Sequence, residues 1–177
     1  MENHKAGFVN IIGKPNVGKS TLMNILVGER LSIVSSKAQT TRHRILGLIN
    51  TEEYQIVFSD TPGMLKPKYE LHKSMMGFVN LSLEDADVIL FVTDLYETDE
   101  EIEEVIQRIN QSGVPVILLI NKIDLAKEGQ LDEVTNYWTS RVNASAVIPI
   151  SAKENFNTER ILQEILDRLP EHPAFYD

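Results

Sequence analysis

The chain has 177 residues, of which 42% are hydrophobic, which is enough for one substantial core and favours a single domain. Its net charge of -9 counts against a domain that coats nucleic acid or an anionic membrane by itself, because those partners select basic surfaces. The absence of cysteine excludes disulfide bonds and thiolate metal sites, and no apolar stretch reaches membrane-spanning length, so we expect a cytoplasmic protein.

The first third of the chain alternates strand and helix signals. The apolar run Phe8 to Ile12 predicts a buried strand, and the run LMNILV after Gly18 predicts a helix. Two further apolar runs, Ile45 to Asn50 and Tyr54 to Asp60, are separated by the polar residues TEE. This spacing is typical of a β-hairpin.

Three more apolar runs, Val88 to Thr93, Val114 to Ile120 and Ala146 to Ile150, are short and rich in Val and Ile. Runs of this kind are typical of parallel strands buried on both faces. Together with the hairpin they predict an α/β fold of three layers, α/β/α, as in the P-loop NTPases. The expected sheet has six strands, is mainly parallel and carries one antiparallel edge strand.

Two later segments have helical periodicity. Ile102, Val105, Ile106 and Ile109 follow TDEE, a capping box at residues 98–101, and a second apolar stripe runs from Ile161 to Leu169 before Pro170. The last segment, PEHPAFYD, has two prolines and no apolar periodicity. We therefore predict one domain over residues 1–169 and, over residues 170–177, the start of a linker to a further domain that is missing here.

The segment GKPNVGKST lies between the first predicted strand and the first predicted helix, and it matches the phosphate-binding P-loop pattern. Gly13 and Gly18 let successive main-chain N–H groups curl around phosphate oxygens. Lys19 adds a positive charge against the β- and γ-phosphates, Ser20 offers a hydroxyl to Mg²⁺, and Thr21 is expected near the α-phosphate. The predicted nucleotide-binding residues here are Gly13, Lys14, Pro15, Asn16, Val17, Gly18, Lys19, Ser20 and Thr21.

The segment NKID, at the end of a predicted parallel strand, indicates which base is bound. The carboxylate of Asp124 can accept hydrogen bonds from N1–H and the N2 amine of guanine, whereas adenine would leave it unpaired. Asn121 can tie this loop to the P-loop, and SAK would place the Ala152 N–H near guanine O6. A capping role in a polar loop is the alternative. The predicted base-binding residues are Asn121, Lys122, Asp124, Ser151, Ala152 and Lys153, with the stem of Lys122 across the base.

Two segments can sense the γ-phosphate. In DTPG, Asp60 can hold Mg²⁺ through a water and the Gly63 N–H can reach the γ-phosphate, although a plain Asp-Pro-Gly turn is the alternative. In KAQTTRHR, Thr41 is the predicted magnesium ligand, with Thr40 as the second choice. The predicted Mg²⁺ ligands are thus Ser20, Thr41 and Asp60, and DTPG adds four nucleotide-binding residues: Asp60, Thr61, Pro62 and Gly63.

Three functions fit these motifs: a GTPase switch, a P-loop kinase or ATPase, and a nucleotide-dependent interaction module with negligible hydrolysis. NKID favours the first of them.

The segments GKPNVGKSTLMN, QTTRHR, DTPG, NKID and SAK, in this order and spacing, resemble the Era family within the TrmE-Era-EngA-like GTPases, from Gly7 to Leu169. The resemblance implies Mg²⁺-dependent hydrolysis of GTP to GDP and phosphate, and a role in assembly of the small ribosomal subunit. It also implies a following KH domain that binds small-subunit ribosomal RNA, and peripheral location at the inner membrane as an addition to the cytoplasm. We expect the domain alone to be a monomer and not to bind nucleic acid strongly.

The water-orienting residue differs from that of many GTPases. Met64 follows DTPG where a glutamine is common, and methionine cannot polarise water. The carboxamide of Asn16 can ligate K⁺ beside the phosphates, and a turn residue after Pro15 is the equal alternative from the sequence alone. The resemblance favours K⁺, with carbonyls around Ser35 to Lys37 completing its shell. The predicted catalytic residues are Asn16, Lys19, Thr41 and Gly63.

Overall fold

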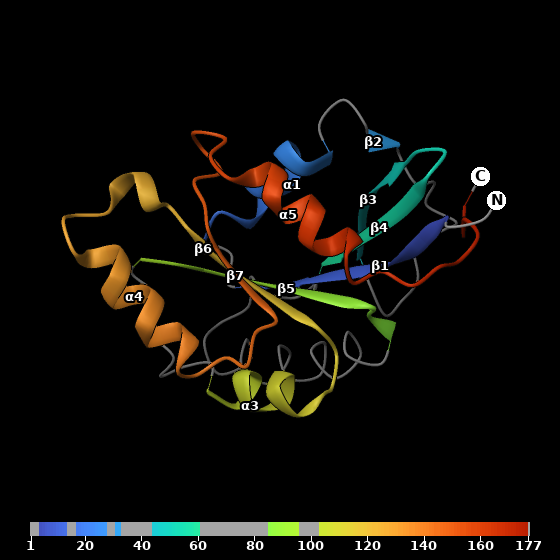
Figure 1. Ribbon diagram of the computed structural model, residues 1–177. Coiled ribbons are helices and arrows are strands. Elements are labelled where there is room, and N and C mark those ends of the chain that lie inside the picture. The colour runs from blue at the N-terminus through green and yellow to red at the C-terminus, as the bar shows by residue number, and fades with distance from the viewer. Residues whose placement is uncertain are drawn as a thin grey trace.

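The computed structural model describes residues 4–13, 17–27, 31–32, 44–60, 85–95 and 103–176. This part of the chain forms one seven-stranded sheet with helices on both faces (Figure 1). The strands are β1 (Lys5–Ile12), β2 (Leu31–Ser32), β3 (Arg44–Asn50), β4 (Tyr54–Asp60), β5 (Val88–Asp94), β6 (Val116–Asn121) and β7 (Ala146–Pro149). The helices are α1 (Lys19–Val27), α3 (Glu103–Gln111), α4 (Gln130–Thr139) and α5 (Thr158–Leu166), with a short 3-10 helix η4 (Ile123–Leu125).

The strand order is β2-β3-β4-β1-β5-β6-β7, and β3 runs antiparallel to both of its neighbours. The pairs β1–β4, β1–β5, β5–β6 and β6–β7 are parallel. The predicted α/β class, with a mainly parallel sheet and one antiparallel strand, is therefore confirmed. Two details differ, because β2 lies outside β3: the sheet has seven strands and not the predicted six, and the antiparallel strand β3 is second from the edge. Two residues are too few for a periodicity argument to detect.

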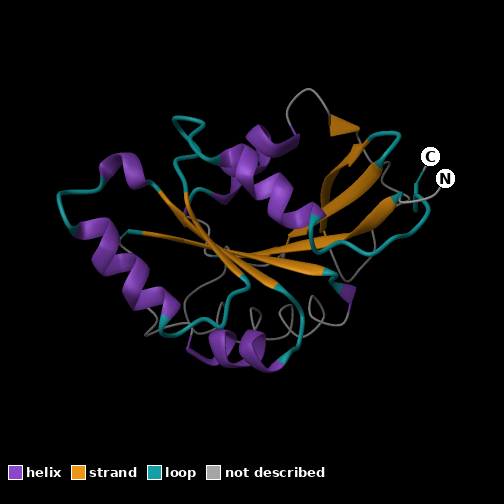
Figure 2. Cartoon of the chain, in the orientation of Figure 1, coloured by secondary structure: helices purple, strands orange, loops and turns teal. Residues whose placement is uncertain are grey.

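Helices cover both faces of the sheet (Figure 2), and each face carries its own hydrophobic cluster. On one face, Val88, Leu90 and Val92 of β5 pack in the cluster that includes α1 and α5. On the other face, Ile89 and Phe91 pack in the cluster that includes α3 and α4. Because alternate side chains of β5 are buried on opposite faces, the strand reads as a continuous apolar run.

Three helices differ in how well the sequence predicted them. In α3, Val105, Ile106 and Ile109 are buried as predicted, whereas the capping box lies outside the described residues. The helix α5 ends at Leu166, earlier than predicted, and a last turn brings Leu169 into the core through its N–H bond to Ile165 O. The helix α4 was missed, because Trp138 is its one fully buried residue and its apolar stripe is weak. Within the described ranges, no helix is long and apolar enough to cross a bilayer.

The segment after α5 packs against the sheet at the end where β1 begins. The Ala6 N–H donates to Pro170 O at 3.3 Å, and the His172 N–H donates to His4 O at 2.9 Å, so the two chain ends lie side by side (Figure 1). The rings of Phe8 and Phe175 have centroids 4.8 Å apart. Residues 170–176 are therefore ordered on the domain surface, and their role as the start of a linker stays a prediction.

Gln55 of β4 holds this segment with both atoms of its amide group. Its side chain is fully buried. Nε2 donates to Tyr176 O at 2.7 Å, while Oε1 accepts from the N–H groups of Phe175 at 2.7 Å and Tyr176 at 3.1 Å. A buried side chain in the sheet thus replaces the strand partner that these main-chain groups would otherwise need.

We expect Gln55→Ala to lower the free energy of unfolding by about 2 kcal/mol, because three part-buried hydrogen bonds made by a fully buried side chain are lost. Urea unfolding gives the difference, and hydrogen exchange should show faster exchange at Phe175 and Tyr176. Gln163→Ala, on the exposed side of α5, is the matched control. Equal unfolding free energies for the two variants would contradict the assignment.

Candidate nucleotide-binding site

The predicted P-loop lies where the sequence placed it, between the end of β1 and the start of α1. Gly13 is buried, and a Cβ there would come within 2.8 Å of the Val92 carbonyl oxygen on β5. Gly18 has φ +92°, and a Cβ there would overlap with Nδ2 of Asn121. Both glycines are therefore required by close approach, and Gly18 also by its backbone conformation.

The side chain of Lys19 is buried, and its Nζ donates to Gly13 O at 3.2 Å. Lys19 is the first residue of α1, so its ammonium group lies at the positive end of a helix. An ammonium and the free N–H groups of a helix start together form a site for an anion. The arrangement fits the predicted contact with the phosphates.

Asn121, the last residue of β6, joins the P-loop to the loop after β7. Its Nδ2 donates to Val17 O at 2.8 Å, which confirms the predicted link to the P-loop. Its Oδ1 accepts from the Ala152 N–H at 3.0 Å, a bond that the sequence did not suggest. The sequence predicts that the same N–H binds guanine O6. In that role the Ala152 N–H would be shared between Asn121 Oδ1 and guanine O6.

Asp124 is held by Ser151 from the neighbouring loop. Ser151 is buried and its Oγ donates to Asp124 Oδ1 at 2.8 Å, while the carboxylate itself is exposed. The hydrogen bond fixes the orientation of the carboxylate before any ligand arrives. Each carboxylate oxygen has two acceptor positions, so this bond leaves capacity for the two donors of guanine.

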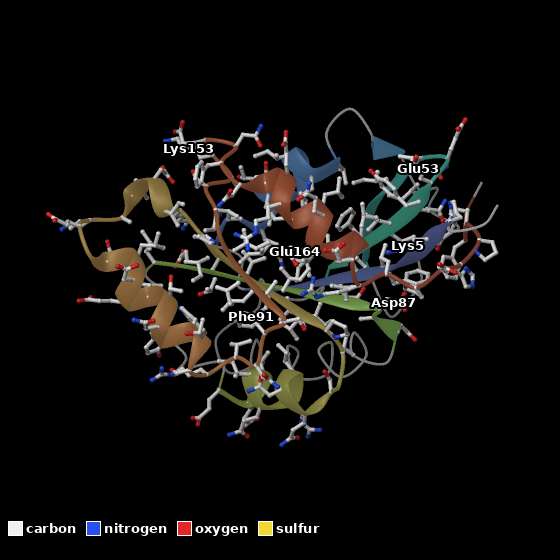
Figure 3. The ribbon with its side chains drawn as sticks, viewed as in Figure 1. Lys5, Glu53, Asp87, Phe91, Lys153 and Glu164 are labelled. Atoms are coloured by element: carbon white, nitrogen blue, oxygen red, sulfur yellow. The ribbon has the colours of Figure 1, made fainter. Side chains whose placement is uncertain are left out.

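The loop that follows β7 is closed by main-chain and side-chain bonds. Phe156 and Ser151 bond to each other through both N–H···O pairs, at 2.9 and 3.2 Å. Asn157 has φ 64°, and its Nδ2 donates to Pro149 O at 2.9 Å. Lys153 lies exposed at the tip, far from Lys5 and Glu53 at the other end of the sheet (Figure 3). The loop is thus a fixed support for Ala152 and Ser151.

Lys122 lies between Asn121 and Asp124 in NKID and makes an ion pair that the sequence did not suggest. Its Nζ lies 2.9 Å from Oδ2 of Asp94, and the side chain of Asp94 is only 4% exposed. In the sequence, Asp94 is visible as an acidic residue at the end of an apolar run. The pairing of β5 with β6 is what places it beside NKID.

A family comparison identifies this arrangement. The model of the family described as "50S ribosome-binding GTPase" matches residues 8–122. The chain belongs to this GTPase family. The resemblance to Era drawn from the motifs is also confirmed, because relatives named GTPase Era match almost the whole chain.

Two of these relatives show the extent of the match. The chain is 44% identical to "GTPase ERA1, chloroplastic" of Zea mays, covering 98% of this chain and 43% of that protein. It is 39% identical to "GTPase Era" of Ruminiclostridium cellulolyticum, covering 98% of this chain and 59% of that protein. The chain therefore spans about half the length of the curated relatives it matches.

Solved structures agree with the fold. The Aquifex aeolicus Era structure bound to GDP and AlF4- has a TM-score of 0.75 at 40% identity and is matched over 98% of this chain and 60% of that one. The structure of Era with MgGDPNP and nucleotides 1506–1542 of 16S ribosomal RNA has the same TM-score at 39% identity, with the same shares covered. The FeoB G-domain of Methanococcus jannaschii, at 23% identity and TM-score 0.61, shares the fold.

Most of the predicted site residues that the structure describes lie at the carboxyl ends of the parallel strands. Ten of them lie at the carboxyl ends of β1, β6 and β7 or at the start of α1: Gly13, Val17, Gly18, Lys19, Asn121, Lys122, Asp124, Ser151, Ala152 and Lys153. Thr21 is exposed on α1. Other predicted residues lie outside the described part of the chain: Lys14, Pro15, Asn16, Thr40, Thr41, Thr61, Pro62, Gly63 and Met64.

Two of the predicted Mg²⁺ ligands, Ser20 and Asp60, have described main-chain positions. Asp60, the last residue of β4, is the register partner of Ile11 on β1, two residues before Gly13. Ser20 is the second residue of α1. Their role as Mg²⁺ ligands stays a prediction, which rests on the preference of this ion for oxygen donors. In the ranges described, no cluster of three or more His, Asp or Glu side chains offers a metal site made of these residues alone.

Proposed function

We propose that the chain binds guanine nucleotides and hydrolyses GTP to GDP and phosphate. The observation that carries this proposal is the cross-link through Asn121, which joins the phosphate-binding loop at Val17 to the base-binding loop at Ala152. Beside it, Ser151 orients the carboxylate of Asp124. A triphosphate cradle and a carboxylate suited to guanine therefore form one connected site.

The phosphate end of the site supplies the chemistry. The ammonium of Lys19 and the main-chain N–H groups of the P-loop balance the charge that builds on the phosphate oxygens. Ser20, Asp60 and Thr41 would hold Mg²⁺, which would supply positive charge against the phosphate oxygens. The Gly63 N–H is proposed to contact the γ-phosphate. The related Era structure is described as a complex with MgGDPNP, which supports Mg²⁺.

Potassium assistance is the proposed substitute for a water-orienting glutamine. Met64 offers no group to polarise the attacking water, so more of the charge stabilisation must come from cations. Asn16, inside the P-loop sequence, is the proposed K⁺ ligand, with carbonyl groups around Ser35 to Lys37. This part of the proposal rests on the sequence and the resemblance to Era.

Hydrolysis measured in two salts tests the proposed activity. We expect single-turnover GTP hydrolysis to be faster in KCl than in NaCl by about tenfold or more, because Na⁺ does not fit the same shell of oxygen ligands. Unlabelled ATP should fail to displace a fluorescent GTP analogue. Equal displacement by ATP would favour the ATPase or kinase alternative, and absence of hydrolysis in either salt would favour an interaction module.

Ribosomal RNA is proposed as a partner of a longer protein that contains this domain. One related Era structure includes a segment of 16S ribosomal RNA, and this chain matches 60% of that protein chain. With a net charge of -9, the present domain is a poor candidate for the RNA contact. We propose that a KH domain after residue 177 makes it and that the GTPase switch controls small-subunit assembly. A cytoplasmic location and a monomeric state are proposed from the sequence alone.

A further inference from the structure

We propose that Asp94 is a positioning residue for base recognition, which acts by holding the side chain of Lys122 along the face of the bound base. The inference rests on the proposed binding of guanine nucleotides. It assigns a role to a buried carboxylate that none of the sequence motifs includes.

The sheet places the two residues together. Asp94 is the last residue of β5, and its register partner on β6 is Asn121, the residue before Lys122. The Nζ–Oδ2 distance is 2.9 Å, while the side chain of Lys122 is 31% exposed and that of Asp94 is 4% exposed. Lys122 therefore reaches back over the strand ends to a carboxylate that is fixed in the sheet.

The main chain of Lys122 is already constrained on both sides. Asn121 is held by its two side-chain bonds, and the Lys122 carbonyl oxygen accepts from the Leu125 N–H at 2.9 Å. Lys122 itself has φ 67°, in the left-handed region. With the backbone set, the remaining freedom lies in the long lysine side chain, and the ion pair restricts its far end.

Stability alone does not explain a carboxylate at this place. Desolvation offsets much of the attraction in a buried ion pair, so the pair by itself is weak evidence for a role in stability. For binding, however, a lysine stem that is already ordered loses little entropy when the base packs against it. The ion pair thus prepares the apolar part of Lys122 for contact with the ring.

Calorimetry with Mg²⁺ tests the inference on four proteins: the wild type, Asp94→Asn, Lys122→Met and the double variant. Methionine keeps an unbranched apolar stem and removes the ammonium group. We expect Asp94→Asn to weaken GDP binding by about tenfold. Inosine diphosphate should lose the same factor, because the stem contacts the ring face and not the N2 amine. In the Lys122→Met background, Asp94→Asn should change affinity by less than about twofold.

The possible results distinguish a positioning role of Asp94 from a purely structural one. GDP affinity within twofold of wild type in Asp94→Asn overturns the inference, and so does an equal loss in the Lys122→Met background, which a purely structural role would give. If Asp94→Asn does not fold, the smaller Asp94→Ser takes its place. Asp132→Asn, at an exposed position of α4, controls for net charge. A wild type with no preference for GDP over ADP overturns the proposed function first.

Discussion

Asp124→Asn is expected to reduce GDP and GTP affinity by about 10³-fold or more, and to create a preference for xanthosine nucleotides. The carboxylate accepts from two guanine donors, N1–H and the N2 amine. A carboxamide replaces one acceptor with an NH₂ donor, which repels the amine of guanine and matches the oxygen that xanthine carries at that position. Ser151 can still donate to the carboxamide oxygen, so the side chain keeps its orientation.

Competition between GDP and xanthosine diphosphate for a fluorescent nucleotide measures this exchange of specificity. Asp132→Asn, an exposed change of equal charge on α4, should leave GDP affinity unaltered. Ser151→Ala should give a smaller loss of about tenfold, because the carboxylate remains but its orientation is no longer fixed. Retained preference for guanine in Asp124→Asn would refute the assignment of this carboxylate.

Gly18→Ala is expected to weaken GDP binding by about 100-fold, which corresponds to about 3 kcal/mol. A Cβ at Gly18 would overlap with Nδ2 of Asn121, so Asn121 must move away from Val17 O. The φ of +92° adds strain for any residue with a side chain. The change therefore separates the phosphate loop from the base loop.

A matched glycine distinguishes the two causes of this loss. Gly113 also has a positive φ, +78°, but a Cβ there would meet nothing within 4 Å. Gly113→Ala should lower the free energy of unfolding by about 1 kcal/mol through strain and leave GDP affinity unchanged. Calorimetry and urea unfolding on both variants measure the two effects. GDP affinity within threefold of wild type in Gly18→Ala would show that the cross-link does not matter for binding.

The expected effects follow from how the site is assembled. The base is recognised by one exposed carboxylate, but that carboxylate is oriented by Ser151, and the same loop is joined to the P-loop through Asn121. Substitutions that remove a ligand contact and substitutions that break the links between loops should therefore both reduce nucleotide affinity. They should differ in base selectivity, because only Asp124 is predicted to accept from both N1–H and the N2 amine of guanine.

The amino-acid pattern was enough to predict the fold class and the chemistry of the two ends of the site. Strands buried on both faces need apolar residues at every position, so β5 and β6 could be read directly from their runs. The P-loop needs glycine, lysine and a hydroxyl at fixed local spacing, and guanine needs a carboxylate. These requirements concern residues that are close together in the chain, so they can be recognised in the sequence.

Which of these residues contact one another depends on the three-dimensional fold. Asp94 meets Lys122 because β5 and β6 are adjacent and in register, and Ser151 meets Asp124 across 27 residues because β7 follows β6 in the sheet. Gln55 binds a segment 120 residues away. Strand order and register bring such pairs together, and neither has a local signature, because many orders satisfy the same apolar pattern.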